Sequence, residues 1–305
     1  MNKLYQAFGV LVMVMMLMLF SFPNQALALD GGGSTELFKL GITNLESNKY
    51  IAAIENFSQA IEINPKLTKA YYNRCLAYLH SSDYQHAITD CNTAIEQNPQ
   101  LFEAYLNRGV AYYNLQLSDA AIADFNYFLT TFPLDYRPYY NRGLAYFDQQ
   151  KYQQSIGDYN KALELIPNSR HNFIAKIYNN KGITYLQLKD FYLAVNDFSQ
   201  AISLNPEDAA FYVNRGHAFR QLEKYEQAIT DYTESIRLNR KQGSAYIGRG
   251  FAFYKSGRQQ EAHEDFLQAA EYFRSQGNMK KFHQLLYVIR ILRRNFPFLS
   301  KAVLV

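Results

Sequence analysis

The residues of this 305-residue chain that could do chemistry are few and scattered. The segment "HEDF" at 263–266 lacks the second histidine of a zinc-protease helix, and two cysteines are too few for a structural zinc site. The triplet "GGG" at 31–33 precedes every expected helix of the repeats, so it reads as a linker and not as a phosphate cradle. We therefore predict no catalytic residue, no metal and no cofactor, and expect a binding protein.

A short motif built on Tyr, Asn, Arg and Gly recurs along the chain. "YLNRG" (105–109) is followed 34 residues later by "YYNRG" (139–143), and "YVNRG" stands at 212–216. A fixed period of 34 residues is typical of a solenoid, whose repeats bury their apolar faces against one another. With five residues inserted at 170–174, we place seven repeats at 34–67, 68–101, 102–135, 136–169, 175–208, 209–242 and 243–276.

Each repeat has two apolar-periodic segments of helical length, which we name helix A and helix B. Positions 4, 8, 11, 20, 24, 27 and 32 of the third repeat hold Tyr105, Gly109, Tyr112, Ala121, Phe125, Phe128 and Pro133. In this pattern the chain resembles the tetratricopeptide repeat (TPR) family over 34–276. The resemblance implies an all-α fold, an α-solenoid in which helix pairs form a right-handed superhelix with the A helices on its concave side.

A cation at position 7 of helix A accompanies a carboxylate at position 23 of helix B. In an antiparallel helix pair these positions lie level with each other, and a guanidinium suits a carboxylate beside it. Repeat one has Leu40 and Asn56 there, so both charges are lost together. We expect structural ion pairs in the other repeats: Arg74 with Asp90, Arg108 with Asp124, Arg142 with Asp158, Lys181 with Asp197, Arg215 with Asp231, and Arg249 with Asp265.

An asparagine precedes most of these cations, at position 6. A side-chain amide both donates and accepts hydrogen bonds, so it matches a peptide backbone. In TPR superhelices that bind extended peptides, an asparagine here points into the concave groove, and the resemblance implies the same role; bonds to neighbouring helices or water are the other interpretation. The candidates are Asn73, Asn107, Asn141, Asn180 and Asn214.

Apolar residues at positions 5, 9 and 12 face the groove or the adjacent A helix. Packing between repeats explains much of this stripe, and the remainder predicts an apolar groove for an extended or helical peptide. The groove candidates at these positions are Tyr72, Leu76, Tyr113, Tyr140 and Phe147.

The two cysteines occupy positions 8 and 24 of one repeat, so helix A presents Cys75 to Cys91 of helix B. In an exported protein a disulfide is plausible at this place, and two buried thiols are the alternative. The distance between the two Cα atoms decides the question, because a disulfide needs less than about 7 Å.

The first 28 residues have the pattern of an export signal. Lys3 precedes an apolar run at 8–22, and "ALA" at 26–28 is a small-residue cleavage site. The run is short for a membrane span, which needs about 20 residues. We expect a signal peptide or an N-terminal membrane anchor over 1–28 and a flexible linker over 29–36, with the protein in a periplasm- or lumen-type compartment or anchored to a membrane.

The segment 278–296 predicts one further helix with an apolar stripe and a basic face formed by Lys280, Lys281, Arg290, Arg293 and Arg294. We expect 277–305 to form a capping helix and tail, with contact to a membrane surface as the lesser interpretation.

The net charge of +4 is small and the repeats contain no basic run, so nucleic acid is not indicated. We expect a non-catalytic scaffold that holds a protein or peptide partner in the concave groove, by family analogy in the assembly of an envelope or thylakoid membrane complex. The alternatives are a structural protein that self-associates through its convex face or C-terminal helix, and an accessory to an envelope enzyme. The sequence does not indicate an oligomeric state.

Overall fold

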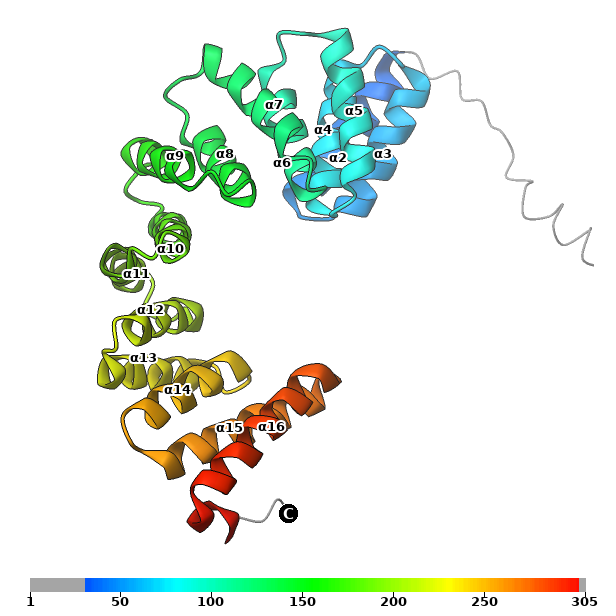
Figure 1. Ribbon diagram of the computed structural model, residues 1–305. Helices are drawn as coiled ribbons and strands as arrows, with labels where there is room; N and C mark the ends of the chain where they lie inside the picture. The colour runs from blue at the N-terminus through cyan, green and yellow to red at the C-terminus, as the bar shows by residue number, and fades with distance from the viewer. Residues whose placement is uncertain (1–30, 302–305) are drawn as a thin grey trace, which may run out of the picture. The chain divides into compact units, whose positions relative to one another are not determined.

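The computed structural model describes residues 31–301, which are α-helical apart from turns and one 3₁₀ segment and contain no strand (Figure 1). The predicted signal peptide or anchor over 1–28 lies outside the described residues. The helices are α2 (Gly31–Glu46), α3 (Tyr50–Ile63), α4 (Thr68–His80), α5 (Tyr84–Gln97), α6 (Phe102–Asn114), α7 (Ser118–Thr131), α8 (Tyr136–Asp148), α9 (Tyr152–Leu165), α10 (His171–Gln187), α11 (Phe191–Leu204), α12 (Ala209–Gln221), α13 (Tyr225–Leu238), α14 (Gly243–Lys255), α15 (Gln259–Ser275), α16 (Met279–Asn295) and η1 (Pro297–Lys301).

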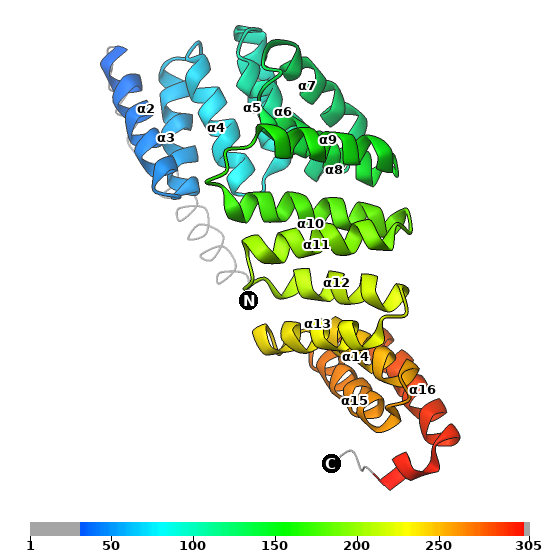
Figure 2. The same ribbon diagram turned by 90° about the vertical axis from the view of Figure 1, so that its left-hand side faces the viewer.

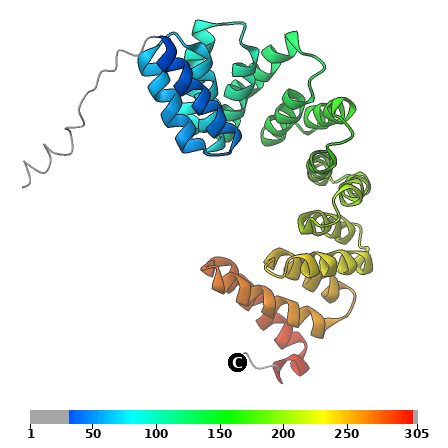
Figure 3. The same cartoon turned by 180° about the vertical axis from the view of Figure 1, so that it is seen from behind.

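The chain divides into two compact units, Met1–Asn107 and Arg108–Val305, with the boundary inside α6. In the first unit α2 packs on α3, α3 on α4, and α4 on α5; Figure 3 shows these blue and cyan helices from behind. In the second unit each helix from α7 to α16 packs on the next, as α10 to α13 do in Figure 2. Packing of consecutive helix pairs is the architecture of an α-solenoid, as the repeat period predicts.

Each repeat is one A helix and one B helix, and local signals end both. The A helix is closed by a residue in the left-handed conformation at position 15, such as Gln116 (φ 62°) or Gln150 (φ 59°). The B helix ends two residues before a proline in repeats one to five; α7, for example, ends at Thr131, ahead of Pro133. These signals set the 34-residue period.

The two helices of a repeat meet at a glycine that lies against an aromatic ring. A Cβ atom built on Gly109 would stand 2.6 Å from Cε1 of Phe125, and one on Gly182 would stand 2.7 Å from Cε1 of Phe198. Both rings are fully buried. The glycine at position 8 is therefore required by the close approach of the aromatic at position 24.

The helices include two segments outside the expected helix pairs, the linker and the insertion. The flexible linker expected over 29–36 is already part of α2 from Gly31 onwards. Ser34 is buried in the first unit, so packing of this first turn outweighs the low helix propensity of the glycines. The insertion at 170–174 extends the A helix of repeat five, because α10 begins at His171.

Helix α16 covers the last B helix, α15. Leu285, Ile289 and Leu292 are buried in the same apolar cluster as Phe266 and Phe273 of α15. No helix among residues 31–301 has both the length and the apolar character needed to cross a bilayer.

Candidate functional site

A cavity of ≈ 160 Å³ lies among three A helices of the second unit. Its lining comes from α6, α8, α9 and α10: Tyr113, Leu144, Phe147, Asp148, Tyr159, Asn180 and Ile183. Three of the predicted groove residues, Tyr113, Phe147 and Asn180, therefore line one cavity. Leu144 and Ile183 stand at position 9, which was expected to face the groove. The sequence analysis missed Asp148 and Tyr159, because Asp148 stands at position 13 and Tyr159 lies on a B helix.

Aromatic rings pack against one another beside this cavity. Tyr159 of α9 is buried, and its ring centroid lies 6.2 Å from that of the groove candidate Tyr140. Tyr140 also meets Phe173 edge-on at 4.8 Å, a contact supplied by the inserted turn of α10. Burial raises the pKa of both tyrosines, so their hydroxyl groups stay neutral at physiological pH.

The rim of the cavity is polar. Asn180 Nδ2 donates a hydrogen bond to the hydroxyl oxygen of Tyr140 at 3.1 Å, which joins α10 to α8. Burial, together with the Asp148 carboxylate, raises the pKa of Tyr113 to about 12. An apolar cavity edged by a carboxylate, an amide and a neutral phenol suits an apolar side chain attached to a polar backbone.

The five candidate asparagines have different surroundings. Asn214 Nδ2 donates to Asn179 Oδ1 at 2.8 Å, a bond between neighbouring A helices like that of Asn180, whereas Asn73 Nδ2 donates to the Lys69 carbonyl of its own helix at 2.7 Å. Asn141 is half-buried and forms no hydrogen bond with a described residue, and Asn107 Nδ2 is buried without a partner among residues 31–301. Asn141 thus keeps its hydrogen-bonding groups available on α8.

The remaining groove candidates, Tyr72 and Leu76, lie half-buried on α4 in the first unit.

The cation at position 7 lies beside the carboxylate at position 23 in each of repeats two to seven. Each Arg forms a two-pronged contact in which Nε and Nη2 face the two carboxylate oxygens, as Arg142 does with Asp158. The shortest N–O distances are 2.6 Å for Arg74–Asp90, 2.7 Å for Arg108–Asp124 and Arg142–Asp158, 3.2 Å for Lys181–Asp197, and 2.8 Å for Arg215–Asp231 and Arg249–Asp265. None of these twelve side chains is among the residues that line the A-helix cavity.

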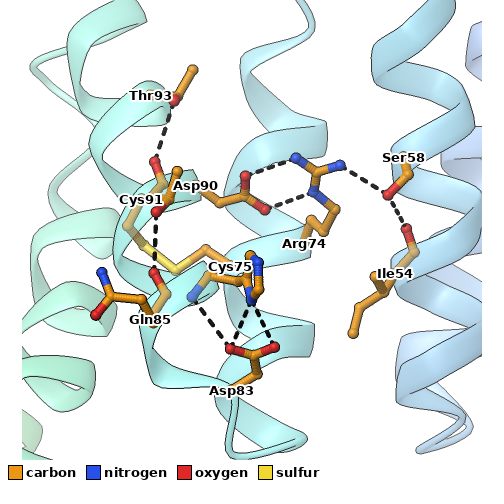
Figure 4. Close-up of polar contacts among 11 residues, drawn as sticks. Ile54, Ser58, Arg74, Cys75, Asp83, Gln85, Asp90, Cys91 and Thr93 are labelled. Carbon is orange, nitrogen blue, oxygen red and sulfur yellow. Dashed lines mark hydrogen bonds and ion pairs between the residues drawn. A yellow bond between two sulfur atoms is a disulfide. The ribbon is translucent and has the colours of Figure 1, made fainter. Parts of the chain in front are cut away.

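The same cations also reach the preceding repeat, a contact that the sequence analysis missed. Figure 4 shows the guanidinium of Arg74 between Asp90 of α5 and the hydroxyl of Ser58 on α3, to which Nη1 donates at 2.8 Å. In five of the repeats the acceptor is the side chain at position 25 of the previous B helix. The other donor–acceptor pairs are Arg142–Asn126 (2.5 Å), Lys181–Asn160 (3.1 Å), Arg215–Ser199 (3.1 Å) and Arg249–Thr233 (3.0 Å).

We name the six ion pairs, together with the contacts of their cations to position 25, the arginine ladder. A sequence signal for it exists, because position 25 holds Ser, Asn or Thr in repeats one to six and Leu267 in repeat seven, after which no cation at position 7 follows. The ladder explains why the Tyr-x-Asn-Arg-Gly motif repeats its Arg: this side chain joins neighbouring repeats.

Cys75 and Cys91 form a disulfide between α4 and α5, with their Cα atoms 5.6 Å apart (Figure 4). They occupy positions 8 and 24, where other repeats place a glycine against an aromatic ring. The small Cys91 leaves the room that the Cβ of Cys75 requires.

Within residues 31–301, no three His, Cys, Asp or Glu side chains come together in a group able to hold a metal ion.

Comparison with protein families gives matches to models described as "Tetratricopeptide repeat" and "TPR repeat". The first description matches residues 68–101, 136–169 and 175–208 in one model and 103–135 in another, and the second matches 44–82 and 216–257. No curated protein matches the sequence significantly.

Solved structures with a similar fold include a tetratricopeptide repeat protein from Parabacteroides merdae, with a TM-score of 0.62 and 20% identity over 83% of this chain and 98% of that chain. PilF from Pseudomonas aeruginosa is similar with a TM-score of 0.60 and 16% identity, over 72% of this chain and 96% of its own. The APC/C hetero-tetramer Cut9–Hcn1 is similar with a TM-score of 0.58 and 15% identity, over 84% and 46%. At these identities the likeness shows the fold alone.

Proposed function

Because the chain belongs to the tetratricopeptide repeat family, whose repeats generally mediate protein–protein interaction, we propose that it is a non-catalytic scaffold that binds an extended segment of a partner protein on the A helices α6, α8 and α10. The observation that carries this proposal is the cavity lined by Tyr113, Phe147 and Asn180. TPR scaffolds are generally non-catalytic, which agrees with the choice of a binding role.

The size and lining of the cavity indicate the ligand. Its ≈ 160 Å³ compares with engineered apolar cavities of about 150 Å³ that hold a benzene molecule, so it suits one large apolar side chain. Asn141 stands one helical turn before Leu144 on the same face of α8, where its free amide can bond a peptide group of the ligand. An extended peptide with one apolar anchor meets both requirements.

The test is selection from a displayed library of short peptides, followed by calorimetry. We compare intact protein with Phe147→Ser and Asn141→Ala, and use Tyr192→Ser as the control, because Tyr192 is an exposed aromatic on the B helix α11. We expect selected peptides to share a large apolar residue and to bind the Phe147 variant at least about tenfold more weakly, a change of about 1.4 kcal/mol. Equal binding by intact protein and the Phe147 variant contradicts the proposal.

For the compartment we propose export or N-terminal anchoring, and for the partner a protein of an envelope or thylakoid membrane complex. The N-terminal pattern of Lys3, the apolar run at 8–22 and "ALA" at 26–28 supports the first part. N-terminal sequencing of protein purified from cells tests it: a chain beginning at Leu29 supports cleavage, and a chain beginning at Met1 in a soluble fraction contradicts both export and anchoring.

A further inference from the structure

A second apolar cavity lies at the C-terminal end of the second unit, between α14 and α16. Its volume is ≈ 160 Å³, and it is lined by Phe251, Tyr254, Phe266, Val288, Ile291 and Leu292. Phe266 and Leu292 are buried at its base, whereas Phe251, Tyr254 and Ile291 remain 38%, 38% and 41% exposed. We name the surface formed by these six residues the C-terminal groove.

Cations lie on two of the helices that form this groove, α14 and α16, and on the neighbouring α12. The guanidinium of Arg220 on α12 lies 5.9 Å from the Phe251 ring centroid, and its Nε is buried without a hydrogen-bond partner among the described residues. Lys255 ends α14. On α16, Lys280 and Arg294 stand 11 residues before and 3 residues after Ile291, so all three share one helix face.

Helix α16 itself carries no carboxylate. The segment 277–301 contains six cations (Lys280, Lys281, Arg290, Arg293, Arg294 and Lys301) and no Asp or Glu. Within residues 31–301, no carboxylate forms an ion pair with Arg220, Lys255, Lys280 or Arg294. The rim therefore presents uncompensated positive charge to whatever covers the apolar floor.

We propose that the C-terminal groove binds an amphipathic helix of a partner protein, with apolar anchors on one face and Asp or Glu residues flanking them. The site is separate from the cavity at Tyr113, Phe147 and Asn180 and does not depend on it.

A helix suits this surface better than an extended peptide. Position 6, which holds asparagine in repeats two to six, is Gly248 in α14, so the groove lacks the side-chain amide that would bond an extended backbone. A helical ligand satisfies its own backbone hydrogen bonds and needs only an apolar groove for its anchors at i, i+3 and i+7. The flanking carboxylates of such a helix would pair with the cations of the rim.

The other occupants of a basic apolar surface agree less well with the geometry. A membrane interface accepts side chains that protrude, whereas Phe266 and Leu292 lie at the base of a recess that needs a side chain inserted into it. A second copy of this chain would bring the same cations to the rim, and juxtaposed like charges disfavour such pairing.

The experiment is selection, on the full chain, from a displayed library of amphipathic helices of about 17 residues, or about 26 Å at 1.5 Å per residue. Apolar anchors are fixed, and each flanking position is randomised among Glu, Lys and Gln. Titration by fluorescence polarisation then compares intact protein with Ile291→Asp and with the double variant Lys280→Glu, Arg294→Glu. The control is Arg240→Glu with Lys241→Glu, which reverses two exposed charges in the turn before α14.

We expect enrichment of Glu at flanking positions and binding that weakens with added salt. Ile291→Asp should weaken binding at least about tenfold, and the Lys280, Arg294 double variant should weaken it about tenfold while gaining affinity for the Lys counterpart of the selected helix. The control should change affinity by less than about twofold. Circular dichroism verifies that each variant is folded.

Three results would overturn the proposal. The first is a selection without enrichment of Glu, or one in which the Ile291 variant binds as the intact protein does. The second is binding to anionic phosphatidylglycerol vesicles that requires Ile291 while no helix is selected, which assigns the surface to a membrane. The third is a dimer in sedimentation that Ile291→Asp dissociates, which assigns it to self-association.

Discussion

Lys181 Nζ lies 3.2 Å from Oδ1 of Asp197, while Oδ2 of the same carboxylate is buried without a hydrogen-bond partner among the described residues. In the other five repeats of the arginine ladder, a guanidinium occupies this place and contacts both oxygens. Lysine is a point charge with a single nitrogen, so it cannot reproduce the fork. The Lys181–Asp197 pair of repeat five is consequently the weakest ion pair of the ladder.

Lys181→Arg should stabilise the protein by about 1 kcal/mol, because it supplies the missing hydrogen bond to Asp197 Oδ2. Urea denaturation of both proteins measures the change as a higher transition midpoint. The conservative control is Arg215→Lys in the next repeat, which should lower the midpoint by a similar amount. A lower midpoint for the Lys181 variant would contradict the assignment.

The advantage of Lys181→Arg should grow as the pH rises from about 4 to above about 6. Burial raises the pKa of Asp197 from 3.8 to about 6, against the opposing effect of Lys181. Between these values the folded chain binds more protons than the unfolded chain, so this group's stabilising contribution is present below pH 3.8 and is lost as the pH rises through about 6. Arginine should lower the pKa of Asp197 and reduce that loss. A difference between the two proteins that is flat with pH would contradict this prediction.

Asp158→Ala should destabilise the protein by about 3 kcal/mol, because it leaves the largely buried Arg142 without its carboxylate. Arg142→Leu combined with Asp158→Asn should restore most of the loss, since neither charge then remains. Asn126→Ala removes only the contact to the previous repeat and should cost about 1 kcal/mol. The melting temperatures of the three variants measure these changes. A double variant that melts no higher than Asp158→Ala would show that Arg142 and Asp158 do not act as a pair.

Replacing Cys75 and Cys91 by serine should cost about 3 kcal/mol of stability, as expected for a loop of this length closed by a disulfide. Cys75→Gly with Cys91→Phe should recover part of it, because it restores the glycine–aromatic contact of the other repeats. Cys91→Phe alone should be less stable than this pair, since the Cβ of residue 75 would meet the ring, as a Cβ on Gly109 would meet Phe125. Denaturation with and without reductant gives the free energies of unfolding. An intact protein whose stability does not change with reductant would argue against the disulfide.

Stability should fall as the pH drops below about 6.5, in part through His263. This side chain is buried between α15 and α16, and its Nε2 accepts a hydrogen bond from Arg293 Nε at 3.0 Å, which requires the neutral ring. Burial and the nearby Arg293 lower the pKa of His263 in the folded chain. The unfolded chain therefore binds more protons, and the stabilising contribution is complete above the unfolded pKa and lost below it.

To test the role of His263, the free energy of unfolding is measured at about pH 7.5 and about pH 5 for the intact protein and for His263→Gln. Glutamine keeps a hydrogen-bond acceptor but does not titrate. A fall of the same size in both proteins would assign the pH dependence to other groups.

Reasoning from the sequence reached some of these features because they lie within one repeat. The 34-residue period placed the helix pairs, and the joint loss of charge at Leu40 and Asn56 pointed to the partners of Arg142 and its equivalents. The contact of Arg142 with Asn126 was missed because it joins two repeats, and the register between repeats is not set by periodicity alone.

Other features depended on packing that the sequence does not display. The five asparagines at position 6 were treated as equivalent, yet Asn180 and Asn73 bond to different helices because their neighbours differ. Arg293 was assigned to the basic face of the last helix, whereas the structure turns it toward His263. Residues 31–36 were expected to be a linker, and burial of Ser34 draws them into α2.

The position-25 oxygens also make the repeats interchangeable modules. Removing residues 209–242 in frame would bring Arg249 opposite Ser199, which already accepts a hydrogen bond from the equivalent Arg215, so the new junction would keep its contact. The same holds for a duplicated repeat. Only the two ends are different, since Leu40 replaces the cation in the first repeat and Leu267 replaces the oxygen in the last. Whole repeats can therefore be gained or lost with little change in the hydrogen bonds between repeats. Leu40 and Leu267 mark the two ends of the series of contacts.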